Sequence, residues 1–281
     1  MRRPSASFDI AYRRMRVPPR VPPVPAVLRL VQLAVLGRWR EAGEELYRAV
    51  ADVTGAAQGQ ELLIVGCGDG VGAEWLATRT GASVTAVDAD PQHIKRAEER
   101  SRTSRRRPSL SLSFQHAPLD DLPHETAVFD VAVGETALAA ASDPSRAVAE
   151  LVRVTKPMGV VVLLQPTWGS ELSLDEQERV VERLGLRPHL LVEWKRMLRD
   201  AGVVDCHVQD WTPCGSVASV GLSWSEKVQI AGQAMRTSGG GWRTIRQAVD
   251  REITLLRELA DERAIGFQLI KGVKWPHARP A

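Results

Sequence analysis

From about residue 60 onward, short apolar segments alternate with longer stretches in which hydrophobic residues recur at helical spacing. Apolar runs of this length, closed by glycine or polar residues, are typical of strands buried on both faces of a sheet. The predicted strands are residues 61–65, 83–87, 111–116, 129–134 and 159–165. The predicted helices between them are residues 73–80, a helix beginning at Pro91, and residues 144–154. This alternation predicts a parallel sheet covered on both faces, with right-handed crossovers.

Two of these helices carry start signals in the sequence. Asp90 stands directly before Pro91, and Ser142 and Asp143 stand before Pro144. Asp and Ser side chains accept hydrogen bonds from the first N–H groups of a helix, and proline fits its first position. We therefore expect both helices to begin at the proline.

After residue 190, helix and strand continue to alternate, and a longer helical stretch then interrupts this alternation. A helix is predicted at 191–201, ended by Gly202, and strands are predicted at 203–211 and 264–273. Between these two strands the chain has helical spacing again. The predicted domains are a basic, helical N-terminal segment at 1–58, a sheet domain at 59–211 and 264–275, and a helical cap at 212–263.

Composition narrows the class of protein. The chain has 281 residues, 44% of them hydrophobic, which is enough to bury a full core. Its net charge of +3 is too small to predict a nucleic-acid partner. Residues 1–58 contain ten arginines and five acidic residues. This charge favours a solvated, partly disordered tail, and the alternatives are steering of an anionic ligand and peripheral contact with a membrane surface.

Cysteine usage and hydropathy bear on location. The three cysteines, Cys67, Cys206 and Cys214, have no metal-ligand spacing and form no disulfide framework, so we expect no metal site and a cytoplasmic protein. The apolar stretch at 24–36 is interrupted by Arg29 and is too short to span a bilayer. It predicts an amphipathic helix that packs on the body of the protein.

A glycine-rich turn, Gly66-Cys67-Gly68-Asp69-Gly70, follows the first predicted strand. Glycines allow the backbone to approach a ligand closely, and the next helix presents free N–H groups. A dinucleotide fingerprint would require a third glycine at position 71, where valine stands. The spacing therefore favours a ligand that does not pack a pyrophosphate on the helix start.

Asp88 ends the second predicted strand, twenty residues after Gly68. In open α/β sheets, ligands bind beyond the carboxyl ends of the strands, where an acidic residue accepts hydrogen bonds from both ribose hydroxyls. Since Asp90 already caps the following helix, Asp88 is not needed for that structural task, and we expect it to bind a ribose. The alternative, that Asp88 only begins a turn, stays open.

Four segments of the predicted sheet domain carry a combined signature, namely residues 63–70, 84–88, 129–133 and 150–159. In this order and at these separations they resemble the motifs of class I S-adenosylmethionine-dependent methyltransferases, in particular the small-molecule, type 11-like enzymes. Residues 191–211 resemble the family's next helix and strand. The resemblance implies a Rossmann-like, seven-stranded, mostly parallel sheet with helices on both faces and an antiparallel last strand at 266–273. It also implies S-adenosylmethionine as cofactor.

The resemblance assigns cofactor contacts to Gly66, Cys67, Gly68, Gly70, Asp88, Ala89, Leu119, Asp120 and Gly134. The glycine-rich turn would contact the methionine part, Asp88 would hold the ribose, and the segment from Leu119 to Asp121 would flank the adenine. The sequence departs from the family pattern at Ile64, where an acid is usual. It also departs at His116, which aligns with the usual adenine-binding acid.

Methyl transfer needs little covalent help, because the sulfonium already activates the methyl group. Alignment and exclusion of water are then sufficient, and a base is needed only if the accepting atom must lose a proton. Glu135, which the family places near the methyl group, is the first candidate for that base. His116 and His124 are weaker candidates, and Glu135 as a cofactor contact or a solvated acid stays open.

Eight tryptophans against two tyrosines point to an aromatic cap. Trp168 follows the fifth predicted strand, while Trp224 and Trp242 lie in the predicted cap. Aromatic faces attract a sulfonium and form an apolar wall for a planar substrate, although ordinary packing explains any single tryptophan as well.

The sequence leaves several functions open. A small-molecule methyltransferase fits the modest charge and the aromatic insertion. The alternatives are a macromolecule methyltransferase that docks RNA or protein on the basic segment, and a non-catalytic S-adenosylmethionine-binding module. A nicotinamide-dependent oxidoreductase fits the glycine spacing worst. The expected partner is a small molecule rather than nucleic acid, with no transmembrane segment, and the sequence leaves open peripheral membrane contact and a homodimer.

Overall fold

The computed structural model describes residues 43–103, 111–169 and 265–276, and residues 172–211 except 176, 179–180 and 182–186. All of these residues belong to one compact unit of the chain. The predicted helices at 24–36 and 212–263, with Trp224 and Trp242, lie outside the described residues, and the predicted domain boundaries stay predictions. In the part that is described, no helix is long and apolar enough to cross a bilayer.

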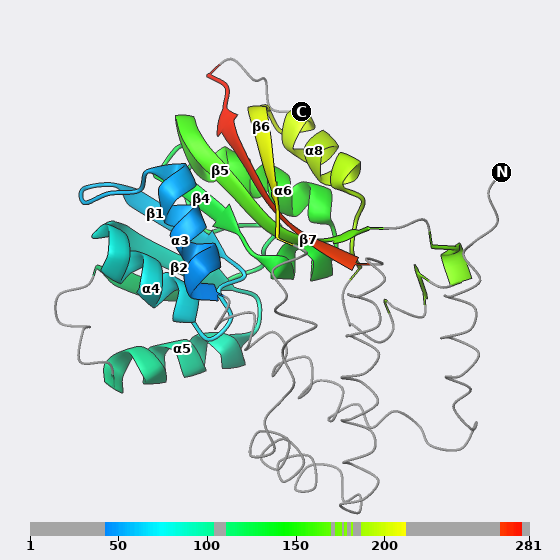
Figure 1. The fold of residues 1–281 in the computed structure, drawn as a ribbon. Helices are drawn as coiled ribbons and strands as arrows, with labels where there is room; N and C mark the ends of the chain where they lie inside the picture. The colour runs from blue at the N-terminus through cyan, green and yellow to red at the C-terminus, as the bar shows by residue number, and fades with distance from the viewer. Residues whose placement is uncertain are drawn as a thin grey trace, which may run out of the picture. The chain divides into compact units, whose positions relative to one another are not determined.

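Seven strands of the described chain form a single sheet (Figure 1). They are β1 (Glu61–Val65), β2 (Ser83–Asp88), β3 (Leu112–His116), β4 (Phe129–Gly134), β5 (Thr155–Trp168), β6 (Val203–Asp210) and β7 (Ile265–Lys274). Their order is β3-β2-β1-β4-β5-β7-β6. The first five strands pair in parallel, and β7 is antiparallel to both β5 and β6. The predicted Rossmann-like sheet with an antiparallel last strand is confirmed.

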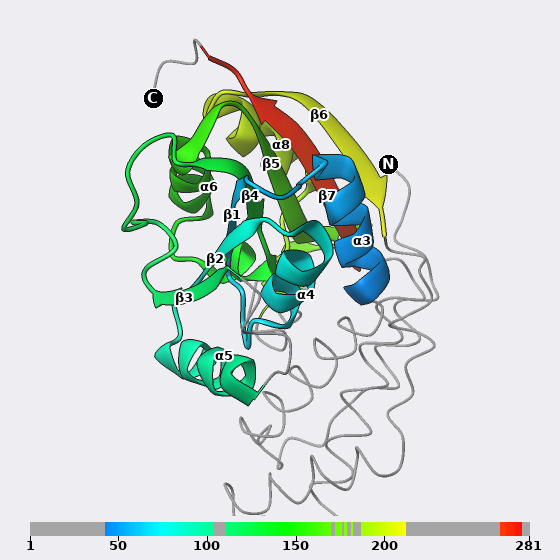
Figure 2. The same cartoon turned by 90° about the vertical axis from the view of Figure 1, so that its left-hand side faces the viewer.

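Helices cover both faces of this sheet (Figures 1 and 2). They are α3 (Gly43–Thr54), α4 (Val71–Thr80), α5 (Pro91–Thr103), the short 3-10 helix η2 (Thr136–Ala140), α6 (Pro144–Val154) and α8 (Leu191–Asp200). Helices α3 and α4 lie side by side on one face, and α6 and α8 lie together on the other.

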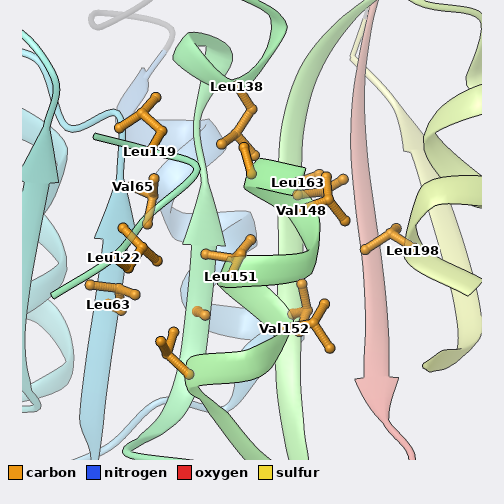
Figure 3. Packing of buried hydrophobic residues seen from close by; sticks show 14 of the residues in the cluster. Leu63, Val65, Leu119, Leu122, Leu138, Val148, Leu151, Val152, Leu163 and Leu198 are labelled. Atoms are coloured by element: carbon orange, nitrogen blue, oxygen red, sulfur yellow. The ribbon is translucent and has the colours of Figure 1, made fainter. Parts of the chain in front are cut away.

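Alternate residues of the strands point into two separate hydrophobic clusters. On β1, Leu62 and Ile64 pack beneath α3 and α4, while Leu63 and Val65 pack against α6 and α8. Figure 3 shows Leu63 and Val65 in the second cluster, beside Leu151 of α6. The four residues Leu62 to Val65 are therefore apolar whichever way they point, which explains why β1 appears as a continuous apolar run in the sequence.

The predicted helix starts are observed. Asp90 accepts a hydrogen bond from the Gln92 backbone N–H at 2.8 Å, and α5 begins at Pro91. Asp143, rather than Ser142, caps α6 and accepts the Arg146 N–H at 3.0 Å.

The observed strands agree with the predicted ones to within a residue, except for β5. This strand spans Thr155–Trp168 rather than residues 159–165. Its extra length comes from the sheet: β7 continues to pair with it as far as Trp168, and its start pairs with Phe129 before a register irregularity. Helix α4 begins two residues earlier than predicted, because Gly70 takes up the left-handed conformation that allows the chain to turn into the helix.

The loop between β3 and β4 is fastened to the end of α6 by Arg153. Its guanidinium donates to the carboxylate of Glu150 at 2.7 and 2.8 Å. It also donates to the backbone carbonyls of Leu122 at 3.1 Å and His124 at 2.9 Å. Glu150 in turn accepts the Leu122 N–H at 2.9 Å. One charged pair therefore closes the loop that contains the predicted adenine-flanking segment.

Replacing Arg153 with methionine is expected to lower the free energy of unfolding by about 1–3 kcal/mol. The substitution leaves the loop carbonyls and the Glu150 carboxylate without their charged donor. Urea unfolding measures the loss. The matched control is Arg102→Met, since Arg102 pairs only across the surface of α5 with Glu98 at 3.1 Å, and such pairs contribute less than about 1 kcal/mol. Equal losses in the two variants would contradict this role of Arg153.

Candidate functional site

The glycine-rich turn lies where β1 ends, between the ends of β2 and β4. Gly66, Gly68 and Gly70 have φ angles of +84°, +54° and +72°, a region that disfavours any side chain. The N–H of Gly66 donates to the Val87 carbonyl at 2.8 Å. A Cβ on Gly66 would stand 2.6 Å from the Cβ of Ala137, so the turn packs directly on η2. Glycine at position 66 is thus required by both the backbone conformation and the close approach.

Asp88, the last residue of β2, holds this turn through its buried carboxylate. Oδ2 accepts the Gly68 N–H at 2.8 Å, and Oδ1 accepts the Asp90 N–H at 2.9 Å. Nδ1 of His93 lies 3.0 Å from the same Oδ1. Asp90 caps α5 as expected, and Asp88 has a different structural task, because its carboxylate joins the glycine-rich turn to the start of α5. Its role in ribose binding stays a prediction.

The Asp88 carboxylate is held ionised. Burial alone would raise the pKa of this group, but the hydrogen bonds from His93 and from the Asp90 and Gly68 N–H groups outweigh it and lower the pKa. The same contact raises the pKa of His93, mainly through its hydrogen bond to Asp88. An ionised carboxylate, which can accept hydrogen bonds from hydroxyl groups, therefore lies at the carboxyl end of β2.

Gly134 and Glu135 follow on the other side of β1. The Glu135 N–H donates to the Val65 carbonyl at 2.8 Å, so the β4 end is attached to the end of β1. The Gln165 amide donates to the carbonyls of Gly134 at 3.0 Å and Glu135 at 2.8 Å. The structure thus brings the glycine-rich turn, Asp88, Gly134 and Glu135 together at one edge of the sheet.

The residues predicted to flank the adenine are buried or hydrogen-bonded to other parts of the chain. Leu119 is buried in the cluster beneath α6, and Asp120 accepts the Ser142 hydroxyl at 3.1 Å. Ala89 is exposed, and its carbonyl lies 3.1 Å from Nε2 of His116 at the end of β3. The Ala89 backbone thus lies near the Asp88 carboxylate, while Asp120 is fastened to the start of α6.

His124 lies away from this edge. Its ring packs edge-on against Phe129, with ring centroids 5.1 Å apart, at the amino end of β4. Glu135 follows the opposite end of the same strand. His124 is therefore not a candidate for the base, and His116 keeps its place at the carboxyl edge, in register with Asp88.

Sequence reasoning missed two residues at the site. Tyr47 of α3 donates its hydroxyl to Oε1 of Glu135 at 2.8 Å, and the Gln165 amide holds the Glu135 backbone. Gln165 could have been found, because a polar residue inside a buried strand needs a partner. Tyr47 carries no such signal, since a tyrosine on an amphipathic helix is usually an ordinary core residue.

Cys67 is buried beside the two carboxylates. Burial raises the pKa of its thiol well above the ordinary value, and the charges of Asp88 and Glu135 raise it further. Because the thiolate is the reactive form, Cys67 is expected to react with iodoacetamide at least about tenfold more slowly in the folded protein than in urea. Peptide mass spectrometry measures the rate. The unfolded protein is the control, and equal rates would contradict the buried position of Cys67.

The strand order, the glycine-rich turn and the acid after β2 together define a class I methyltransferase-type fold. Residues 63–163 match the family model described as a methyltransferase domain, and this segment of the chain is such a domain. The O-methyltransferase cnsE of Penicillium expansum is 34% identical over 121 residues, which are 43% of each chain. The erythromycin 3''-O-methyltransferase of Saccharopolyspora erythraea is 35% identical over 34% of this chain and 33% of its own.

Solved structures share the fold over more of the chain. The geranyl diphosphate C-methyltransferase of Streptomyces coelicolor A3(2), solved with Mg²⁺, geranyl diphosphate and S-adenosyl-L-homocysteine, has a TM-score of 0.62 and 18% identity. The similarity covers 86% of this chain and 82% of that one. The chain spans less than half the length of the two curated relatives named above. At 18% identity, the likeness to this solved structure is one of fold alone.

Proposed function

We propose that this protein transfers a methyl group from S-adenosylmethionine to a small-molecule acceptor. The observation that carries the proposal is the hydrogen bond of 2.8 Å between the Asp88 carboxylate and the Gly68 N–H. It joins the predicted ribose-binding acid to the glycine-rich turn. The match of residues 63–163 to a methyltransferase domain supports the same reaction.

The described residues fit this cofactor. Gly66 and Gly68 adopt left-handed backbone that a Cβ would strain, and Asp88 supplies an ionised carboxylate at the end of β2. Each carboxylate oxygen has two lone-pair sites, so Oδ2 can accept a ribose hydroxyl in addition to the Gly68 N–H. The negative charges of Asp88 and Glu135 also favour a cationic ligand. When bound, S-adenosylmethionine would supply a methyl group already activated by its sulfonium.

Glu135 is the proposed general base for acceptors that carry a proton on the accepting atom. Hydrogen bonds hold its backbone at both the N–H and the carbonyl. The point from which the side chain extends is therefore fixed at the end of β4. A base must lie within hydrogen-bond reach of the proton it takes, and a fixed backbone limits where that proton can be. For an acceptor without such a proton, Glu135 would act only as a fixed charge.

A small-molecule acceptor is proposed over a macromolecule on two grounds. The curated relatives named above include an erythromycin 3''-O-methyltransferase, whose name specifies a small acceptor. The chain's net charge of +3 is also modest for a protein that binds nucleic acid. A cytoplasmic location and any peripheral membrane contact or homodimer remain predictions from the sequence.

The test is release of S-adenosylhomocysteine during incubation with S-adenosylmethionine and separate pools of hydroxylated, phenolic, amine and prenyl-type small molecules, RNA and protein. Turnover with a small-molecule pool, reduced at least tenfold by Asp88→Asn, is expected. Asp52→Asn, an exposed change on α3, is the matched control. Turnover only with RNA or protein would favour the macromolecule enzyme, and cofactor binding without turnover would favour the non-catalytic module.

A further inference from the structure

Tyr47 lies on α3, outside the segment that forms the sheet, yet it reaches the proposed catalytic edge. Its side chain is buried, with 8% of the residue exposed, and its hydroxyl lies 2.8 Å from Oε1 of Glu135. The two residues are 88 positions apart in the chain. Val50, one helical turn later, is fully buried on the same side of α3, so the inward face of this helix directs Tyr47 toward the sheet.

The phenol ring crosses the first turn of α4 over Gly72. A Cβ on Gly72 would stand 2.1 Å from Cζ of Tyr47 and 2.2 Å from its hydroxyl oxygen. Gly72 is not among the glycines with positive φ, so its backbone conformation is open to any residue. Helix propensity would favour alanine at this place. Glycine at position 72 is therefore explained by the phenol that lies over it.

The backbone and the carboxylate of Glu135 are thus both held by hydrogen bonds. The backbone is fixed by Val65 and Gln165, as described above, and the carboxylate is fixed by the Tyr47 hydroxyl. A glutamate side chain has several rotatable bonds, and fixing one rotamer has an entropic cost that a charge-assisted hydrogen bond offsets.

We propose that Tyr47 is a positioning residue for the methyl transfer, acting through Glu135. The inference rests on the proposed function. The acceptor's lone pair forms the bond to the methyl carbon, the carbon–sulfur bond breaks with its electrons on sulfur, and the acceptor's proton passes to Glu135. Tyr47 holds that carboxylate in one place. Helix α3 thereby contributes to the reaction although it lies outside the matched domain at 63–163.

Calorimetric titration provides a readout that does not need the acceptor. A carboxylate held near the reacting group favours the cationic S-adenosylmethionine over the neutral S-adenosylhomocysteine. We expect Tyr47→Phe to lower the ratio of the two affinities about threefold or more, and Glu135→Gln to lower it at least as much. The double variant should lose no more than Glu135→Gln alone, because Tyr47 acts through that carboxylate.

Two further variants separate positioning from packing. Gly72→Ala keeps both Tyr47 and Glu135 but displaces the phenol, so it should lower the same ratio as Tyr47→Phe does. Trp75→Phe changes the ring whose centroid lies 6.4 Å from that of Tyr47 and should leave the ratio unchanged. With an acceptor from the assay above, Tyr47→Phe should lower kcat about tenfold with little change in KM.

The outcomes are distinguishable. If the wild-type protein binds both ligands and Tyr47→Phe leaves their affinity ratio unchanged, the inference is overturned and the proposed function stands. A Trp75→Phe variant that lowers the ratio as much as Tyr47→Phe would also overturn it, since packing would then explain the effect. If the wild-type protein binds neither ligand, the proposed function fails and the inference fails with it.

Discussion

The Asp88→Asn variant is expected to bind S-adenosylmethionine at least tenfold more weakly than the wild-type protein, a loss of about 1.4 kcal/mol or more. Asparagine has the shape of aspartate but presents one oxygen and one NH2 group. The native carboxylate accepts from Gly68 N–H on one oxygen and from Asp90 N–H and His93 on the other. In either orientation of the amide, its NH2 group faces an N–H donor. The glycine-rich turn or the α5 start therefore loses its acceptor.

Calorimetry at neutral pH measures this loss, with Asp52→Asn as the control because Asp52 is exposed on α3. Circular dichroism of both variants establishes that they are folded. Wild-type affinity in a folded Asp88→Asn protein would contradict the assignment of the ribose site to Asp88. It would then leave only the structural role that the hydrogen bonds show.

Gly66→Ala is expected to have the largest effect on stability, a loss of about 2–5 kcal/mol. Left-handed backbone costs an L-residue about 1–2 kcal/mol, and overpacking adds about 1–3 kcal/mol. Gly66 has a φ of +84°, and the added methyl would stand 2.6 Å from the Cβ of Ala137. Because η2 and the glycine-rich turn would move apart, cofactor binding should also be lost.

Two matched variants separate the contributions in urea unfolding. Gly59 has a φ of +86° with nothing within 4 Å of an added Cβ, so Gly59→Ala reports the backbone cost alone. Combining Gly66→Ala with Ala137→Gly removes the methyl that clashes and should recover part of the stability. If Gly66→Ala is no worse than Gly59→Ala, the close contact between the turn and η2 is not as described.

The sequence could predict the fold because its central strands, β1 and β4, are buried on both sides. Leu62 and Leu63 point into different clusters and are both fully buried, so the apolar runs mark the strands well. The extent of β5 could not be predicted in the same way. Its outer residues are ordered by pairing with β7, which lies about a hundred residues later in the chain.

The candidate site was predictable where a residue type has few other uses. The glycines after β1 and the acid after β2 were identified, and they do lie together. The hydrogen bonds that Asp88 accepts could not be predicted, because they depend on where the turn and α5 meet in space. Tyr47 was missed for the same reason, since only the packing of α3 on α4 brings its hydroxyl to Glu135.

The most direct test of the proposed function is calorimetric titration of the wild-type protein with S-adenosylmethionine and with S-adenosylhomocysteine. The arrangement of Asp88 and the glycine-rich turn predicts one binding site per chain, with micromolar affinity for both ligands. Absence of binding for both, in protein shown to be folded, would contradict the central claim. The methyltransferase domain would then be a fold without its usual ligand.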